Sequence, residues 1–239
     1  MNNLILFIVT LLIIGSCATL DREVGNGIEQ DKTIQLSSFD GISYDLSDEL
    51  IVKEGELFEA KLIGDSNILD NIALEIRNGI LYIDLVPGNY VNINMKVEVT
   101  LQNLKLVENT GSGDIVIERR ADDNDDLLLI TDGSGNIEVK PQLLLKEISV
   151  KVDGSGSVSF DGQTSASKFD IYTDGSGDIN AYSLSTQFCD MLTDGSGEVR
   201  LTVSEELVGT ITGSGNTYYK GTPQIRIVSD GSGRLINKN

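Results

Sequence analysis

The tripeptide GSG occurs seven times between residues 111 and 233, at positions 111–113, 133–135, 154–156, 175–177, 195–197, 213–215 and 231–233. Successive copies begin 22, 21, 21, 20, 18 and 18 residues apart. A near-constant period of this length is typical of proteins built from stacked repeats. The sequence therefore predicts a repeat architecture in which each GSG forms the turn of one repeat.

Apolar residues alternate with mixed residues on both sides of each turn. In the third repeat, Ile148, Val150 and Val152 precede the turn, and Val158 and Phe160 follow it. A period of two predicts two β-strands per repeat, each with one buried face. A single coil of this kind cannot bury its inner face alone and must stack on its neighbours. We therefore predict an all-β fold, a β-solenoid with coils of about 20 residues.

Two glycines in every turn indicate either a positive φ angle or a close approach of two backbones, where a Cβ atom would be unfavourable. The turn glycines are Gly111, Gly113, Gly133, Gly135, Gly154, Gly156, Gly175, Gly177, Gly195, Gly197, Gly213, Gly215, Gly231 and Gly233. The residue before the turn is Asp in five copies and Thr in two. We expect these side chains to accept hydrogen bonds from the N–H groups of their own turn. A calcium ladder along the Asp column is the alternative, although Thr is a poor calcium ligand.

Residues 1–17, MNNLILFIVTLLIIGSC, are typical of a bacterial lipoprotein signal peptide. The apolar run is short for a membrane span and ends in small residues. The last four residues, Ile14 to Cys17, resemble a lipobox, which makes Cys17 the predicted lipid attachment site and gives the protein a membrane anchor. The n-region contains no Lys or Arg. An ordinary secretory signal or a short membrane anchor is therefore the alternative.

Three segments are expected in the chain. Residues 1–17 are the signal peptide, and residues 18–33, polar and without apolar periodicity, are a flexible tether. Residues 34–239 form the solenoid, with N-terminal rungs or a cap over 34–106 and the seven GSG repeats over 107–239. A separate small β domain at the N-terminal end is the alternative. The dipeptide Asn78–Gly79 between two apolar runs predicts a tight hairpin turn, and the acidic insert at 119–126 predicts a solvated loop.

Composition limits the chemistry. The chain has 37 acidic and 18 basic residues, a net charge of −19, and its surface should repel nucleic acid. It contains no His, the commonest general base. Cys189 lies in an apolar column and is expected to be a buried structural thiol. We therefore predict no enzyme activity, no metal and no cofactor. A carbohydrate-active enzyme that uses a carboxylate pair remains the least favoured alternative.

The chain resembles a known family over residues 34–237. The resemblance rests on SFDGI from Ser38, VKEG from Val52, GDSNILDNI from Gly64, NGILYI from Asn78, the repeated DGSG turns and the closing run LVGTITGSGNTYYKGTPQIRIVSDGSGRLIN. These motifs are similar to those of the head GIN-domain family, putative auto-transporter adhesins found as envelope lipoproteins. The resemblance implies a right-handed parallel β-solenoid and a lipoprotein of the outer membrane, and it leaves open whether the protein faces the cell surface or the periplasm.

Three functions follow as hypotheses. We favour a lipid-anchored adhesin that binds an extracellular glycan or protein through a broad face of the solenoid. The alternatives are a periplasm-facing structural or sensing lipoprotein and a carbohydrate-active enzyme. Four tyrosines could stack on sugars, although we expect one of each pair to point inward and to serve in packing: Tyr218 with Tyr219, and Tyr172 with Tyr182. The sequence predicts neither the ligand nor the oligomeric state.

Overall fold

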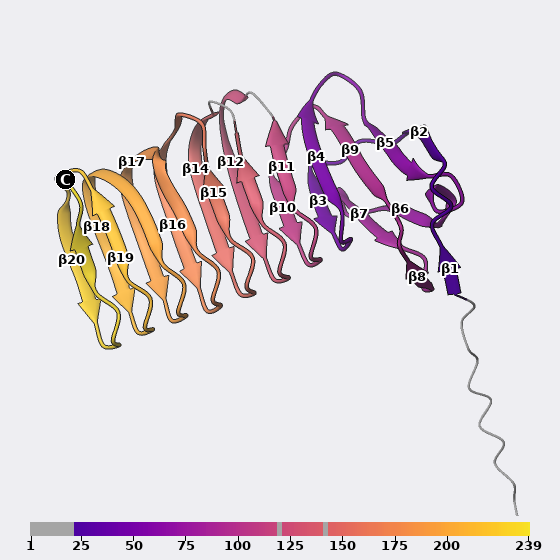
Figure 1. Ribbon diagram of the computed structural model, residues 1–239. Coiled ribbons are helices and arrows are strands. Elements are labelled where there is room, and N and C mark those ends of the chain that lie inside the picture. Colours follow the sequence, from indigo (N-terminus) through magenta and orange to yellow (C-terminus); the bar gives the residue numbers. More distant parts are fainter. Residues whose placement is uncertain (1–21, 119–120, 141–142) are drawn as a thin grey trace, which may run out of the picture.

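The computed structural model describes residues 22–118, 121–140 and 143–239. Over these residues the protein is all-β apart from one short 3-10 helix, η1 (Leu69–Asn71). Figure 1 shows a row of parallel coils that runs from a cap near the N-terminal end to the C-terminus. No helix in the described part of the chain is long and apolar enough to cross a membrane. The predicted all-β solenoid is confirmed.

Each coil contributes one strand before its GSG turn and one strand after it. The pre-turn strands are β10 (Leu106–Asn109), β12 (Ala121–Thr131), β14 (Leu143–Val152), β16 (Thr164–Thr173) and β20 (Gln224–Ser229). The post-turn strands are β11 (Ile115–Glu118), β13 (Ile137–Val139), β15 (Val158–Phe160), β19 (Thr217–Lys220) and β21 (Leu235–Asn237). Two long strands, β17 (Ile179–Thr193) and β18 (Val199–Ile211), are post-turn at their start and pre-turn at their end. Each strand pairs in parallel with its counterpart in the next coil.

The core follows the predicted alternation. In the third coil, Ile148, Val150, Val152, Val158 and Phe160 are all buried. The equivalent residues of neighbouring coils stack on them in columns and form one continuous apolar core. Burying a side chain of this size stabilises the fold by about 1.5–3 kcal/mol. The stack therefore buries the inner face of every internal coil.

The turn glycines lie where stacked turns make close contact. A Cβ atom added to Gly175 or Gly177 would lie closer than 3.0 Å to a backbone carbonyl oxygen of the preceding turn, a distance that real Cβ atoms avoid. Glycines with φ in the left-handed region occur elsewhere in the chain, for example Gly27 and Gly79. Of the two reasons that the sequence leaves open for these glycines, the structure therefore supports close backbone approach.

The aspartates before the turns do not cap them, and this prediction is wrong. In the turn after Asp153, the N–H groups of Ser155 and Gly156 donate to the carbonyl oxygen of Gly133 in the preceding coil, at 3.0 and 3.2 Å. The N–H groups of Asp153 and Gly154 likewise donate to the carbonyl of Thr131. Backbone carbonyls of the neighbouring coil thus satisfy the donors that the Asp side chain was expected to bind.

The cap pairs with the first coil through parallel strands, and its strands farther from the coils pair antiparallel with one another. β3 (Gly41–Tyr44) and β4 (Glu49–Glu54) pair with β10 and β11 of the coils, and with β7 (Ile80–Leu85) and β9 (Met95–Leu101) on their other side. β6 (Ile72–Arg77) pairs antiparallel with β7, and β5 (Glu59–Asp65) with β9. The hairpin at Asn78–Gly79 is confirmed, because both residues have positive φ. The cap strands named here share one sheet with the coils, and the apolar core is continuous through both regions.

Two local predictions are wrong. The expected flexible tether, residues 18–33, contains β1 (Arg22–Val24), which pairs with β8 (Asn89–Val91), and most of β2 (Glu29–Gln35), which pairs antiparallel with β5. Residues 18–21 lie outside the described residues. The acidic insert at 119–126 was expected to be a loop, but from residue 121 onward it forms the start of β12. In this part β12 pairs in parallel with β14, and the register shifts twice.

Candidate functional site

The solenoid has two outward faces beside the turns, one formed by the pre-turn strands and one by the post-turn strands. Because side chains alternate along a strand, each outward position repeats from coil to coil as a column. On the post-turn face, Asn180, Arg200, Tyr218 and Ile236 are register partners in one such column. This face carries the polar network and the basic side chains that distinguish the C-terminal coils.

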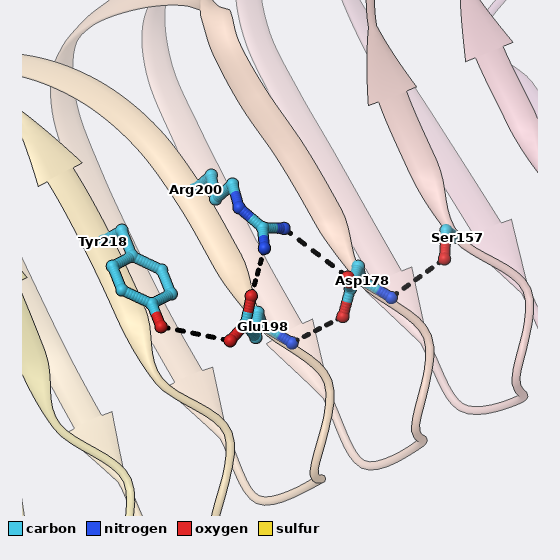
Figure 2. Close-up of polar contacts among 5 residues, drawn as sticks. All are labelled: Ser157, Asp178, Glu198, Arg200 and Tyr218. Carbon is cyan, nitrogen blue, oxygen red and sulfur yellow. Dashed lines mark hydrogen bonds and ion pairs between the residues drawn. The ribbon is translucent and has the colours of Figure 1, made fainter.

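A ladder of side chains follows the turns along this face. The side-chain oxygens of Asp114, Asn136, Ser157 and Asp178 each accept the backbone N–H of the equivalent residue in the next coil, at 2.9, 2.9, 3.0 and 2.7 Å. Figure 2 shows its last two steps, from Ser157 to Asp178 and from Asp178 to Glu198. The ladder fixes the position of each turn relative to the one before.

Glu198 connects this ladder to the outward face. Its carboxylate accepts the Tyr218 hydroxyl at 3.0 Å and pairs with the Arg200 guanidinium. Arg200 also reaches Asp178, at 3.4 Å. Figure 2 shows Glu198 between these partners. The network therefore holds the Tyr218 ring in place from its hydroxyl end.

Two lysines of the last coils lie over tyrosine rings on the same face. The Nζ atom of Lys220 is 4.3 Å from the centre of the Tyr182 ring, and that of Lys238 is 5.2 Å from the centre of the Tyr218 ring. Partial burial raises the pKa of the Tyr182 phenol, and Arg200 opposes this effect. We call Tyr182, Tyr218, Lys220 and Lys238 the lysine–tyrosine patch.

The lysines of the patch differ from the other lysines of the chain. All eleven lysines lie within the described residues. Nine of them have a carboxylate within 4.0 Å: Lys32, Lys53, Lys61, Lys96, Lys105, Lys140, Lys146, Lys151 and Lys168. Lys220 and Lys238 are exposed and have no such partner among the described residues. The patch therefore presents positive charge that the strongly acidic protein does not neutralise.

The same face is acidic closer to the cap. Glu138 lies beside Asp161, and its pKa is raised, first by burial and then by the hydrogen bond with Asp161, while Lys140 opposes the shift. No group of three or more His, Cys, Asp or Glu side chains in the described residues is arranged to hold a metal ion. The face is thus divided into an acidic part near the cap and a basic, aromatic part at the last coils.

The remaining sequence candidates lie apart from this patch. Cys17 is outside the described residues. Cys189 is buried, as predicted, and burial raises the pKa of its thiol far above the ordinary value. Tyr219 is buried and Tyr218 points outward, as the alternation predicts. The expectation that one of Tyr172 and Tyr182 points inward is wrong, because Tyr172 is exposed on the pre-turn face and Tyr182 is half-buried on the post-turn face.

Two grooves lie outside the post-turn face. A groove of about 700 Å³ is lined by uncharged residues, many of them Ser or Thr, such as Ser165, Ser185 and Ser204. A second groove, of about 380 Å³, lies on the pre-turn face between Tyr172 and Leu192. The lysines beside it are paired with carboxylates. Among the described residues, the first groove is lined by neither a charged residue nor an aromatic ring, and the second has no unpaired lysine beside its Tyr172 ring.

Comparison with known proteins places the chain in a family. The family model described as putative auto-transporter adhesin, head GIN domain, matches residues 38–223. The chain belongs to this head GIN-domain family. The match covers the cap and most of the coils, so the family's domain includes both regions described above.

Solved structures share the fold at low sequence identity. A putative adhesin from Bacteroides fragilis has a TM-score of 0.84 and 21% identity, over 90% of this chain and all of that one. A putative adhesin from Parabacteroides merdae has a TM-score of 0.74 and 20% identity, over 92% and 100%. A chain from Parabacteroides distasonis described as a putative lipid binding protein has a TM-score of 0.72 and 23% identity, over 90% and 100%. No curated protein sequence matches the chain.

Sequence reasoning named Tyr182 and Tyr218 but missed Lys220 and Lys238. The signal was present in the repeat. Aligned on the first glycine of each turn, the position seven residues later reads Glu118, Lys140, Asp161, Tyr182, Thr202, Lys220 and Lys238. This outward column changes from acidic or mixed to basic along the chain. The inward columns, which predict the core, do not show this change.

Proposed function

We propose that the protein is a non-catalytic adhesin of the bacterial cell envelope, anchored by a lipid on Cys17, that binds an extracellular glycan or protein through the post-turn face. The observation that carries the proposal is the lysine–tyrosine patch, which offers two unpaired cations and two aromatic rings at the surface. Membership of a family described as putative adhesins supports a binding role.

A catalytic role has less support. The sequence has no His, and the Cys189 thiol is buried with its pKa raised, so it is a poor nucleophile. The Glu138 and Asp161 carboxylates are near each other, whereas retaining and inverting glycosidases need carboxylates about 5 Å or more apart with the sugar between them. A binding surface requires none of these groups.

A binding array tests the function. Because residues 22–239 carry the shared core and sheets, the fragment 18–239 should fold without the signal peptide. This fragment is applied to arrays of glycans and extracellular matrix proteins, with calcium and with a chelator. We expect selective binding that the chelator does not abolish. An absence of selective binding in both conditions would contradict the adhesin proposal.

Anchoring and display need separate measurements. Substituting Cys17→Ser should prevent incorporation of radiolabelled palmitate into the protein. Protease added to intact cells should cleave the wild-type protein if it faces outward. Cleavage only after the outer membrane is permeabilised would instead place the protein in the periplasm.

A further inference from the structure

The two unpaired lysines are neighbours in the sheet. β19 and β21 pair in parallel with Tyr219 opposite Asn237, and Lys220 and Lys238 are the next residues of each strand. The backbone N–H of Lys238 donates to the Tyr219 carbonyl at 2.8 Å, so the two strands are still paired at this point. Adjacent strands are about 4.8 Å apart. Like charges directly opposite each other on adjacent strands are destabilising, and a bound anion would offset their repulsion.

The tyrosine rings fix where these charges stand. A lysine ammonium is attracted to the face of an aromatic ring, which reduces the conformational freedom of the long side chain. Lys238 lies over the Tyr218 ring, whose hydroxyl is held by Glu198. Lys220 lies over Tyr182, whose residue is tied to the next coil because its carbonyl accepts the Thr202 hydroxyl at 2.9 Å. The patch is therefore organised before any ligand arrives.

We infer that the lysine–tyrosine patch binds the anionic groups of an acidic polysaccharide, either the carboxylates of uronic acids or sulfate esters. The Nζ atoms of Lys220 and Lys238 can each donate charge-assisted hydrogen bonds to anionic groups of the polysaccharide. The apolar faces of the sugar rings can contact the exposed parts of the two tyrosines. The inference rests on the proposed adhesin function and names its ligand class.

The charge of the whole protein favours a polysaccharide over other polyanions. Nucleic acid and anionic bilayers are bound by broad basic surfaces, and this chain has a net charge of −19. The patch is narrow and is followed along its column by Asp161. A thin sugar chain can place one or two acidic groups on the patch without crossing the acidic part of the face.

A binding titration tests the inference. The full-length chain, kept in solution with a neutral detergent, is titrated with polygalacturonate fragments, with dextran sulfate, and with methyl-esterified polygalacturonate, in which the carboxylates are blocked. The test variant is Lys220→Gln/Lys238→Gln. The matched control is Lys32→Gln/Lys61→Gln, which removes the same charge from two exposed lysines that already have acidic partners.

We expect binding of at least one acidic polymer, Kd at least tenfold higher for the test variant, a change below twofold for the control, and no binding of the methyl ester. Preference between the two polymers distinguishes carboxylate from sulfate. Equal losses in both double variants, binding of neither acidic polymer, or binding only to phosphatidylglycerol vesicles would overturn the inference. If the array shows selective binding to neutral glycans or proteins while both acidic polymers fail here, the adhesin proposal stands and only the inference is lost.

Discussion

Gly27 in the cap and Gly177 in the coils show two different uses of the same residue. Gly27 has a φ of +68°, and a Cβ atom added there would meet nothing within 4 Å. Gly177 is not among the glycines with positive φ, but an added Cβ would collide with the carbonyl of Gly156. Gly27 thus provides a backbone conformation that other residues adopt less readily, whereas Gly177 lets one turn lie directly on the next.

The cap and the last coils also differ in whether their lysines have carboxylate partners. Every lysine of the cap has a carboxylate partner, as the ion pairs of Lys32, Lys53, Lys61 and Lys96 illustrate. The last coils contain the two lysines that lack one. Surface ion pairs add little stability, with a median of about 0–1 kcal/mol, so the difference has little effect on folding. It matters for what the two regions can bind.

The largest expected effect is on the stack of turns. Substituting Gly177→Ala should destabilise the protein by about 3 kcal/mol or more, because the added methyl group must push two stacked turns apart. In a domain of this size that corresponds to a fall in Tm of roughly 6–12 °C. Thermal unfolding followed by circular dichroism measures it. An unchanged Tm would show that the turns are not in tight contact.

The next effect concerns the buried carboxylate that ties the cap together. Asp65 is buried and accepts the backbone N–H groups of Gly27 at 2.7 Å and Asn94 at 2.8 Å. Substituting Asp65→Ala leaves both donors without this acceptor and should cost about 2–3 kcal/mol in unfolding free energy. Urea titration gives the value. Asp31→Ala, at an exposed acidic residue of β2, is the control and should change stability by less than about 0.5 kcal/mol.

A smaller effect is expected at Gly27. Substituting Gly27→Ala places an L-residue at positive φ without a steric collision and should cost about 1 kcal/mol. Gly27→Asn should be better tolerated, because Asn adopts this conformation more readily. Comparing the melting temperatures of both Gly27 variants with that of Gly177→Ala tests whether Gly27 is needed for its positive φ and Gly177 for close packing of the turns. If Gly27→Ala were as damaging as Gly177→Ala, glycine would not have the two separate uses described above.

The smallest effect should appear in the pH dependence of stability. The pKa of Glu138 is raised in the folded protein, so its contribution to stability is fully present below the ordinary pKa of Glu and is lost as the pH rises through the raised value. Glu138→Gln should therefore raise Tm relative to wild type more at pH 7 than at pH 4. Asp161→Asn should act in the same direction because it removes the other carboxylate. A larger gain at pH 4 would contradict the assignment.

The coils were predictable because the signals for their strands and turns lie within each repeat of the sequence. The alternation around Val150 and Val158 predicts which side chains are buried, and the period predicts stacking. The failure of Asp153 to cap its turn was not predictable in this way, because the acceptor that takes its place, the Gly133 carbonyl, comes from another coil. The local sequence identifies an Asp side chain that could accept the N–H groups of its turn. It does not show that a backbone carbonyl of the neighbouring coil accepts them instead.

The cap and the candidate site were harder to predict, because both are formed by contacts between residues that are far apart in the sequence. Residues 29–35 look polar and irregular, but they form an edge strand because β5 offers them a partner. The lysine–tyrosine patch combines side chains of three different coils, which the sequence brings together only when outward positions are aligned by repeat. The alternation in the sequence indicates that Tyr218 points outward, whereas the lack of acidic partners around Lys220 and Lys238 depends on residues that become neighbours only in the folded protein.

Lysine acetylation with and without ligand tests the claimed binding role of the last coils most directly. The full-length chain in neutral detergent is treated with a limiting amount of acetylating reagent, alone and with the acidic polymer that it binds, and each lysine is quantified by mass spectrometry. We expect the polymer to slow acetylation of Lys220 and Lys238 several-fold and to leave the acetylation rates of Lys32 and Lys61 in the cap unchanged. Equal slowing at all lysines, or slowing confined to the cap, would contradict it.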